Sequence, residues 1–192
     1  MLLLVIGGSA SGKSEYAEAR AVAAACQRKS AEIRANAGKK YYIAAMKPFG
    51  EEAGKRIAHH QALRAGKGFE TLERYTDLAG LSRERPDLAG QTVLVECLSN
   101  LTANEMFEPE GAGAAGAEEA ILLGIHSLSE LAETVIVVTA DVFGEGRIPE
   151  TEECSDLTDQ YIRVLGSVNA KLAQMADEVV EVVYSIPVKQ KG

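Results

Sequence analysis

The feature that most constrains the fold is a short apolar run followed at once by a glycine-rich loop. Leu2-Leu3-Leu4-Val5-Ile6 precedes Gly7-Gly8-Ser9-Ala10-Ser11-Gly12-Lys13-Ser14, and an Ala- and Glu-rich stretch follows. The loop fits the pattern Gly-x4-Gly-Lys-Ser, placed between a strand and a helix. Its glycines allow a tight turn whose backbone N–H groups point inward, and the positive end of the following helix faces the same space. The sequence therefore predicts an anion cradle of the kind that binds nucleotide phosphates.

The same pattern predicts a role for individual positions of the loop. Backbone amides from Gly8 to Gly12 would hold the phosphates, Lys13 would reach the β- and γ-phosphates, and Ser14 would bind Mg²⁺ through its hydroxyl. The predicted nucleotide-binding residues of the loop are Gly7, Gly8, Ser9, Ala10, Ser11, Gly12, Lys13 and Ser14. An accidental glycine turn is the alternative, and the flanking strand and helix argue against it.

Apolar runs and helical stretches alternate along the rest of the chain. We predict strands at residues 2–6, 41–45, 92–96, 134–139 and 179–184, and helices at residues 14–27, 51–64, 98–107, 117–133 and 157–176. Several strands are apolar at successive positions, which is typical of strands buried on both faces. The alternation predicts an α/β fold of the P-loop NTPase type: three α/β/α layers, a mostly parallel sheet, and a single nucleotide-binding domain over residues 1–192.

Two segments interrupt this alternation. Residues 29–40 are polar and are expected to protrude before the second strand. Residues 111–116 read Gly-Ala-Gly-Ala-Ala-Gly and are expected to form a mobile surface loop, with a lid over a substrate as the alternative.

Composition argues against several classes of partner. The chain has 192 residues and a net charge of −8. Nucleic acid and anionic membranes both require a basic surface, so we expect neither as a partner. The cysteines Cys26, Cys97 and Cys154 are odd in number and widely spaced, which fits reduced thiols in a cytosol. No apolar run is long enough for a membrane span or a signal peptide, so we expect a soluble, cytoplasmic protein.

A second group of polar residues lies in the predicted helix at residues 51–64. Residues four apart share a helix face, so Arg56, His60 and Arg64 form one stripe, while His59 lies about 100° around the axis. Positive charge on either side of an imidazole favours its neutral, nucleophilic form, and arginines can bind phosphate oxygens. This combination would suit a phospho- or nucleotidyl-histidine intermediate. On these residues alone, a solvated basic face is the simpler interpretation.

Together these motifs resemble the bifunctional adenosylcobinamide kinase/adenosylcobinamide-phosphate guanylyltransferase family of cobalamin biosynthesis. The resemblance extends nearly end to end. Beyond the loop, the matching segments are Tyr42-Ile43-Ala44-Ala45, Arg56-Ile57-x-x-His60 with Arg64, Glu96-Cys97-Leu98 with Asn104, Asp141-Val142 with Gly146 and Pro149, Gly166-x-x-Asn169-x-x-Leu172, and Ala176-Asp177-Glu178-Val179. None of these segments is specific alone, but their order and spacing are.

The resemblance implies two reactions. In the first, a nucleoside triphosphate, ATP or GTP, phosphorylates the aminopropanol hydroxyl of adenosylcobinamide. In the second, GTP transfers GMP to an enzyme histidine and releases pyrophosphate, and the cobinamide phosphate then attacks this intermediate to give adenosylcobinamide-GDP. The resemblance also implies Mg²⁺, a corrinoid substrate and a homotrimer.

The resemblance further implies roles for particular residues. The guanylylated histidine falls in the His59-His60 pair; His60 keeps the Arg-Ile-x-x-His spacing, and His59 is the alternate. Lys13 is the third expected catalytic residue. The nucleotide-binding residues carried over beyond the loop are Ala44, Ala45, Met46, Arg64, Glu73 and Glu96, and the metal ligands are Ser14 and Glu96. The alternatives are a helix-capping or first-turn acid for Glu96 and an ordinary surface carboxylate for Glu73.

Two other functions stay open at this point. One is a small-molecule P-loop kinase without guanylyl transfer. The other, less favoured, is a GTP-binding regulatory switch, a class that usually carries Asn-Lys-x-Asp for guanine recognition. This chain has no such motif.

Overall fold

The chain is described here by a computed structural model, which covers residues 1–27, 38–48, 50–141 and 152–192; for residues 52, 53, 56, 59, 63 and 152–155 it describes the backbone alone. The strands are β1 (Leu2–Gly7), β2 (Lys40–Ala44), β3 (Phe69–Glu73), β4 (Thr92–Glu96), β5 (Thr134–Ala140), β6 (Glu178–Val183) and β7 (Ile186–Lys191). The helices are α1 (Lys13–Cys26), α2 (Gly50–Arg64), α3 (Leu78–Glu84), α4 (Leu98–Phe107), α5 (Gly113–Leu131) and α6 (Glu152–Met175), with a 3-10 turn η2 (Pro86–Leu88).

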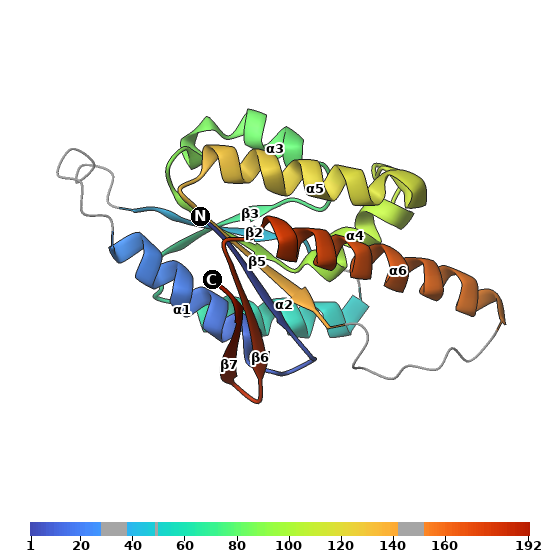
Figure 1. Cartoon of the computed structure of the whole chain (residues 1–192), viewed down its shortest axis with the longest axis horizontal. Helices are drawn as coiled ribbons and strands as arrows, with labels where there is room; N and C mark the ends of the chain where they lie inside the picture. Colours follow the sequence, from blue (N-terminus) through green and yellow to red (C-terminus); the bar gives the residue numbers. More distant parts are fainter. Residues whose placement is uncertain (28–37, 49, 142–151) are drawn as a thin grey trace.

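The strands form one sheet in the order β3-β2-β4-β5-β1-β6-β7. All neighbouring strands run parallel except β6 and β7, which form an antiparallel hairpin. Figure 1 shows α1 and α2 on one side of the sheet and α3, α4, α5 and α6 on the other. The predicted α/β fold with three layers and a mostly parallel sheet is confirmed.

The central strands are apolar at successive positions because each face of the sheet has its own core. On one face, Leu3 and Val5 of β1 pack with Ala17 and Ala21 of α1. On the other, the intervening strand residues pack with apolar side chains of α3, α4, α5 and α6. This two-sided burial holds the carboxyl ends of the strands at one edge, where ligands of parallel sheets bind.

Each predicted strand and helix overlaps an observed one, but β3, α3 and β7 were not predicted. The expectation of a loop at residues 111–116 is wrong for residues 113–116, because α5 begins at Gly113. Of the segment 29–40, residues 29–37 lie outside the described residues, and Lys40 begins β2.

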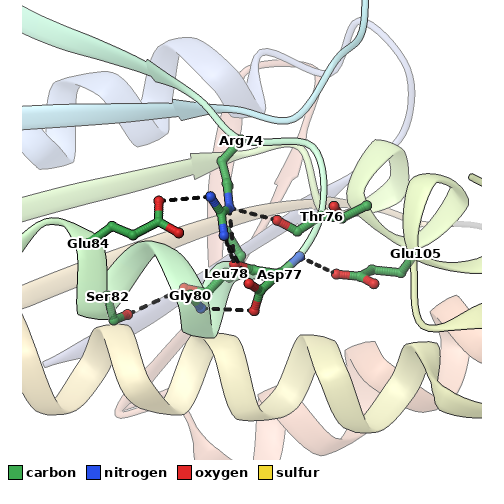
Figure 2. A network of polar contacts seen from close by, with 8 residues as sticks. All are labelled: Arg74, Thr76, Asp77, Leu78, Gly80, Ser82, Glu84 and Glu105. Carbon is green, nitrogen blue, oxygen red and sulfur yellow. Dashed lines mark hydrogen bonds and ion pairs between the residues drawn. The ribbon is translucent and has the colours of Figure 1, made fainter. Parts of the chain in front are cut away.

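Figure 2 shows the polar contacts around Asp77 at the start of α3, including the one with Glu105 of α4. The Glu105 side chain of α4 is buried, and its two oxygens accept the backbone N–H groups of Asp77 at 2.7 Å and Ala112 at 3.0 Å. Asp77 in turn caps α3 by accepting the N–H of Gly80 at 2.8 Å, and Arg74 donates to the Asp77 carbonyl. One buried carboxylate therefore joins the start of α3 to the start of α5, which explains the error in the loop prediction.

None of the helices within the described ranges combines the length and the apolar character that crossing a bilayer requires.

Candidate nucleotide-binding and nucleophile site

The glycine-rich loop lies at the carboxyl end of β1, between the ends of β5 and β6. Gly12, just before α1, has a φ of 87°, a left-handed conformation that favours glycine. A Cβ on Gly7 would lie 2.6 Å from the carbonyl oxygen of Val182, so the neighbouring strand leaves no room for a side chain there. Backbone conformation thus favours glycine at position 12, and close strand packing requires it at position 7.

Lys13 folds back over this loop. Its Nζ donates a hydrogen bond to the carbonyl oxygen of Gly8 at 2.8 Å. The hydroxyl oxygen of Ser11 is buried and has no hydrogen-bond partner among the described residues. An ammonium group and an unpaired hydroxyl on one glycine-rich loop suit a polyphosphate.

Glu96 brings a buried carboxylate to the same place from the end of β4. It is 6% exposed, and its Oε1 accepts a hydrogen bond from the hydroxyl of Ser14, the first turn of α1. Its Oε2 is buried without a hydrogen-bond partner in the described part of the chain. A hydroxyl beside an unpaired carboxylate oxygen fits Mg²⁺, which is usually held by one or two protein oxygens together with substrate phosphates.

Helix α2 brings His60 to this carboxylate. The Nδ1 atom of His60 lies 3.6 Å from Glu96 Oε1, and 24% of the histidine side chain is exposed. Nδ1 is therefore the ring nitrogen that faces the Glu96 carboxylate. Lys13, Ser14, Glu96 and His60 therefore meet within one chain.

Only part of the predicted basic stripe can be placed. The side chains of Arg56 and His59 lie outside the described residues. Arg64 is 8% exposed, and its guanidinium carbon lies 3.5 Å from the centroid of the Tyr42 ring. Its Nη1 is buried without a hydrogen-bond partner among the described residues. Arg64 thus packs on the sheet by a cation–π contact, and it does not lie on a solvated face.

The phenol of Tyr42, which lies beside Arg64, has a raised pKa. Burial raises this pKa far above its ordinary value, and the neighbouring Glu96 carboxylate raises it further. The ring therefore remains neutral beside two charged groups at any physiological pH.

Sequence analysis missed a buried ion pair next to the site. Glu18 of α1 is fully buried, and its Oε2 accepts a hydrogen bond from Lys67 Nζ at 2.6 Å. Glu18 lies one turn beyond Ser14 on the same helix face, a spacing that could have indicated its position. Lys67 lies three residues after the end of α2 at Arg64, so the pair ties the end of the histidine helix to α1, the helix that follows the glycine-rich loop.

The other predicted nucleotide contacts are more dispersed. Ala44 pairs in register with Glu96 on one side and Glu73 on the other, so all three share the carboxyl edge of the sheet. Ala45 is fully buried in the opposite core, and its carbonyl accepts a hydrogen bond from Asn104. Met46 is half-buried just beyond it. Glu73 is exposed and accepts a hydrogen bond from the Tyr75 hydroxyl at 2.9 Å.

Several residues that carried the sequence resemblance hold strand ends in place. Asn169 accepts the Thr139 hydroxyl at 2.7 Å and donates to the Ala140 carbonyl at 3.1 Å. Asp177 accepts the backbone N–H of Leu2 at 2.7 Å, at the start of β1. Residues 142, 146 and 149 of the resemblance lie outside the described residues.

Comparison with known proteins identifies the family of this chain. The family profile for cobinamide kinase / cobinamide phosphate guanyltransferase matches residues 3–190. The bifunctional adenosylcobalamin biosynthesis protein CobU of Escherichia coli is 31% identical over 201 residues, and that of Salmonella typhimurium is 32% identical over 203 residues, each over 100% of both chains. CobP of Pseudomonas aeruginosa is 30% identical over 190 residues, covering 98% of this chain and 96% of its own.

Among solved structures, a KaiC-like protein from Pyrococcus horikoshii superposes with a TM-score of 0.49 at 12% identity, over 94% of this chain and 69% of that one. The family assignment rests on the sequence matches alone. Because the profile spans almost every residue and the relatives match along their full length, the chain belongs to the cobinamide kinase / cobinamide phosphate guanyltransferase family.

Proposed function

We propose that this chain performs the two activities of its family at one site, with His60 as the residue that carries GMP between GTP and the cobinamide phosphate. The observation that carries the proposal is the position of His60 Nδ1, 3.6 Å from the Glu96 oxygen that also accepts the hydroxyl of Ser14. The full-length similarity to bifunctional relatives supports the same conclusion.

In the kinase step, the backbone amides of the loop and Lys13 hold the triphosphate and offset its charge in the transition state. The aminopropanol hydroxyl of adenosylcobinamide loses its proton to solvent, and its oxygen attacks the γ-phosphorus. A new O–P bond forms, the bond between the γ-phosphorus and the β–γ bridging oxygen breaks, and the nucleoside diphosphate leaves. Ser14 and Glu96 are the residues proposed to hold Mg²⁺, which when bound neutralises phosphate charge.

In the guanylyl step, Nε2 of His60 attacks the α-phosphorus of GTP. A P–N bond forms, the bond to the bridging oxygen breaks, and pyrophosphate leaves from the loop. The ring gains positive charge in this step, and the Glu96 carboxylate beside Nδ1 stabilises that charge. A phosphate oxygen of adenosylcobinamide phosphate then attacks the same phosphorus, the P–N bond breaks, and adenosylcobinamide-GDP is released.

Three finer properties belong to the same proposal. The unpaired Glu96 Oε2 beside Ser14 supports Mg²⁺ as the metal. The family resemblance supports a homo-oligomer, a trimer. The widely spaced cysteines and acidic composition support a cytoplasmic protein that binds neither nucleic acid nor membranes.

Labelled GTP separates the two steps. Incubation with GTP labelled at the α-phosphate should leave an acid-labile, base-stable label on the wild-type protein. His60→Ala should carry no label but still phosphorylate cobinamide, Lys13→Ala should fail in both steps, and His59→Ala should be labelled like the wild type. Label retained in His60→Ala would exclude His60 as the nucleophile. Cobinamide phosphorylation by a wild type that takes no label would identify a plain kinase.

A further inference from the structure

The turn between β6 and β7 rests directly on the phosphate loop. The backbone N–H of Ser185 donates to the carbonyl oxygen of Ser11 at 2.7 Å. A Cβ on Gly12 would lie 2.6 Å from Ser185 Oγ, so the turn and the loop are in close contact. Figure 1 shows the tip of this hairpin beside the connection from β1 to α1. The β6–β7 turn and the glycine-rich loop, which are far apart in the sequence, thus lie side by side.

The turn carries residues that its geometry does not favour. Tyr184 and Ser185 link Val183 to its strand partner Ile186, and their φ angles are 48° and 64°. A two-residue turn with both central φ angles positive strongly favours Asn-Gly. The Tyr184 side chain is also 91% exposed, so the ring contributes nothing to the core. The backbone conformation of the turn disfavours a tyrosine at this position, and the ring gains nothing from core packing. A large aromatic residue at such a position indicates a functional constraint.

The strands that lie on either side of the loop indicate how a bound nucleotide is oriented. Ser14 faces Glu96 of β4, so the metal and the γ-phosphate of a phosphoryl donor belong on that side. Strand β6 lies on the other side of β1. A triphosphate with its terminal phosphate near Glu96 therefore directs its nucleoside toward the β6–β7 turn.

We infer that the Tyr184 ring is the platform on which the purine base of the phosphoryl-donor nucleotide stacks. This inference rests on the proposed function of the loop as the triphosphate site. Stacking on an aromatic face accepts any purine, since every base offers a π-face. Both ATP and GTP then serve as phosphoryl donors without a base-specific motif.

The guanylyl step provides an internal control. His60 must reach the α-phosphorus, and His60 lies on the Glu96 side of the loop. In that step the α-phosphate occupies the Glu96 side, so the guanosine extends away from the turn. Tyr184 should therefore affect the kinase step and not the guanylylation of His60.

Two substitutions test the platform in the full-length protein. Tyr184→Asn removes the ring and suits a left-handed backbone, whereas Tyr184→Phe keeps the ring. Tyr184→Asn should raise the KM for ATP in cobinamide phosphorylation by about 5- to 20-fold, and Tyr184→Phe should have the same KM as the wild type. Inhibition by inorganic tripolyphosphate, which has no base, should not change. An unchanged KM for ATP in Tyr184→Asn would overturn the inference. An equal loss of inhibition by tripolyphosphate, or an equal loss of His60 guanylylation, in the same variant would overturn it as well.

The absence of tryptophan from the chain allows a direct binding measurement. Tyr184→Trp creates a single reporter whose fluorescence should be quenched by the β,γ-imido analogue of ATP but not by tripolyphosphate. Leu123→Trp, at a 57% exposed position of α5, is the matched control and should respond to neither. If calorimetry shows that the analogue binds but the fluorescence at position 184 is not quenched, the stacking inference is overturned and the proposed function of the loop is not. Failure of the wild type to bind either ligand would overturn the proposed loop function as well.

Discussion

At the scale of single residues, Glu96 links the two halves of the site. One of its oxygens accepts the Ser14 hydroxyl and lies near His60, and the other is buried without a partner among the described residues. An unpaired buried oxygen of this kind is costly unless a metal, water or substrate satisfies it.

We therefore expect Glu96→Gln to raise the Mg²⁺ concentration needed for half-maximal kinase activity by at least roughly 10-fold, because the amide keeps the shape and loses the charge. Magnesium titration of the kinase reaction measures this. Glu70→Gln is a suitable control, since Glu70 lies on β3, is 48% exposed and pairs with Arg85. An unchanged magnesium requirement in Glu96→Gln would remove Glu96 from the metal site.

The sequence singled out four residues that the structure brings together, but it did not predict their surroundings. Lys13, Ser14, Glu96 and His60 were expected to lie at one site, because motif spacing indicates the residue types that phosphate chemistry needs. The ion pair between Glu18 and Lys67 and the stacking of Arg64 on Tyr42 were not expected. Both depend on where α2 lies against the sheet, and no local pattern in the sequence encodes that position.

At the scale of elements, Arg20 and Glu178 join α1 to the start of β6. The two side chains form paired hydrogen bonds at 2.9 and 2.7 Å. The bond from Arg20 lowers the pKa of Glu178 below its usual 4.5, more than partial burial raises it. A carboxylate whose pKa is lower in the folded state contributes stability above its unfolded pKa, and this contribution is lost as the pH falls through the folded value.

Glu178→Gln should accordingly lower the free energy of unfolding by about 0.5–1.5 kcal/mol at neutral pH, a modest figure because the pair is partly exposed. The difference from the wild type should shrink as the pH falls below the usual value of 4.5 and through the lower pKa of the folded state, where the wild-type carboxylate also becomes neutral. Urea denaturation across this pH range measures it. Glu181→Gln on the same strand, where the partner Gln190 is uncharged, should show little pH-dependent difference. A difference for Glu178→Gln that stays constant with pH would contradict the account.

In the β6–β7 turn, a substitution that stabilises the fold should weaken binding of the phosphoryl-donor nucleotide. Replacing Tyr184-Ser185 by Asn-Gly should raise the free energy of unfolding by about 0.5–1 kcal/mol, because both residues then suit a left-handed backbone. The same variant should bind the phosphoryl donor more weakly. Urea denaturation and the KM for ATP measure the two effects, and a destabilised variant would contradict this explanation of the turn.

The elements missed by sequence analysis are those at the edges of the sheet. The outer strand β3 buries none of its side chains fully, and every residue of β7 is exposed. Pro187 further weakens the strand signal of β7. Helix α3 spans only Leu78–Glu84, too short for a clear hydrophobic period. Edge strands bury little apolar surface, and a helix of this length offers too few residues to show a period, so these sequences carry little of the pattern on which prediction depends.

At the scale of the whole molecule, the two-sided sheet explains why the fold could be predicted. Buried central strands produce apolar runs, and the connecting helices follow from their periodicity. The site is assembled from three separate parts of the sequence, the loop after β1, the end of β4 and helix α2. Because all three belong to one chain, each subunit of an oligomer should hold a complete set of these groups.

A mixture of two inactive variants tests that statement. Lys13→Ala and His60→Ala subunits, co-expressed with different tags and purified through both, should form mixed oligomers without labelling from α-labelled GTP. Each subunit of such an oligomer lacks one essential group of its own site. Recovery of substantial labelling would mean that the loop of one subunit serves the histidine of another.

The central claim is that the phosphate loop presents GTP to His60 of the same site, and mapping the modified residue tests it most directly. Trypsin cleaves after Arg56 and Arg64, so the peptide of residues 57–64 contains both candidate histidines. After reaction with GTP and digestion at alkaline pH, fragmentation of this peptide by mass spectrometry should place the added GMP on His60. GMP on His59, GMP on another peptide, or no modified peptide from an active preparation would contradict the account.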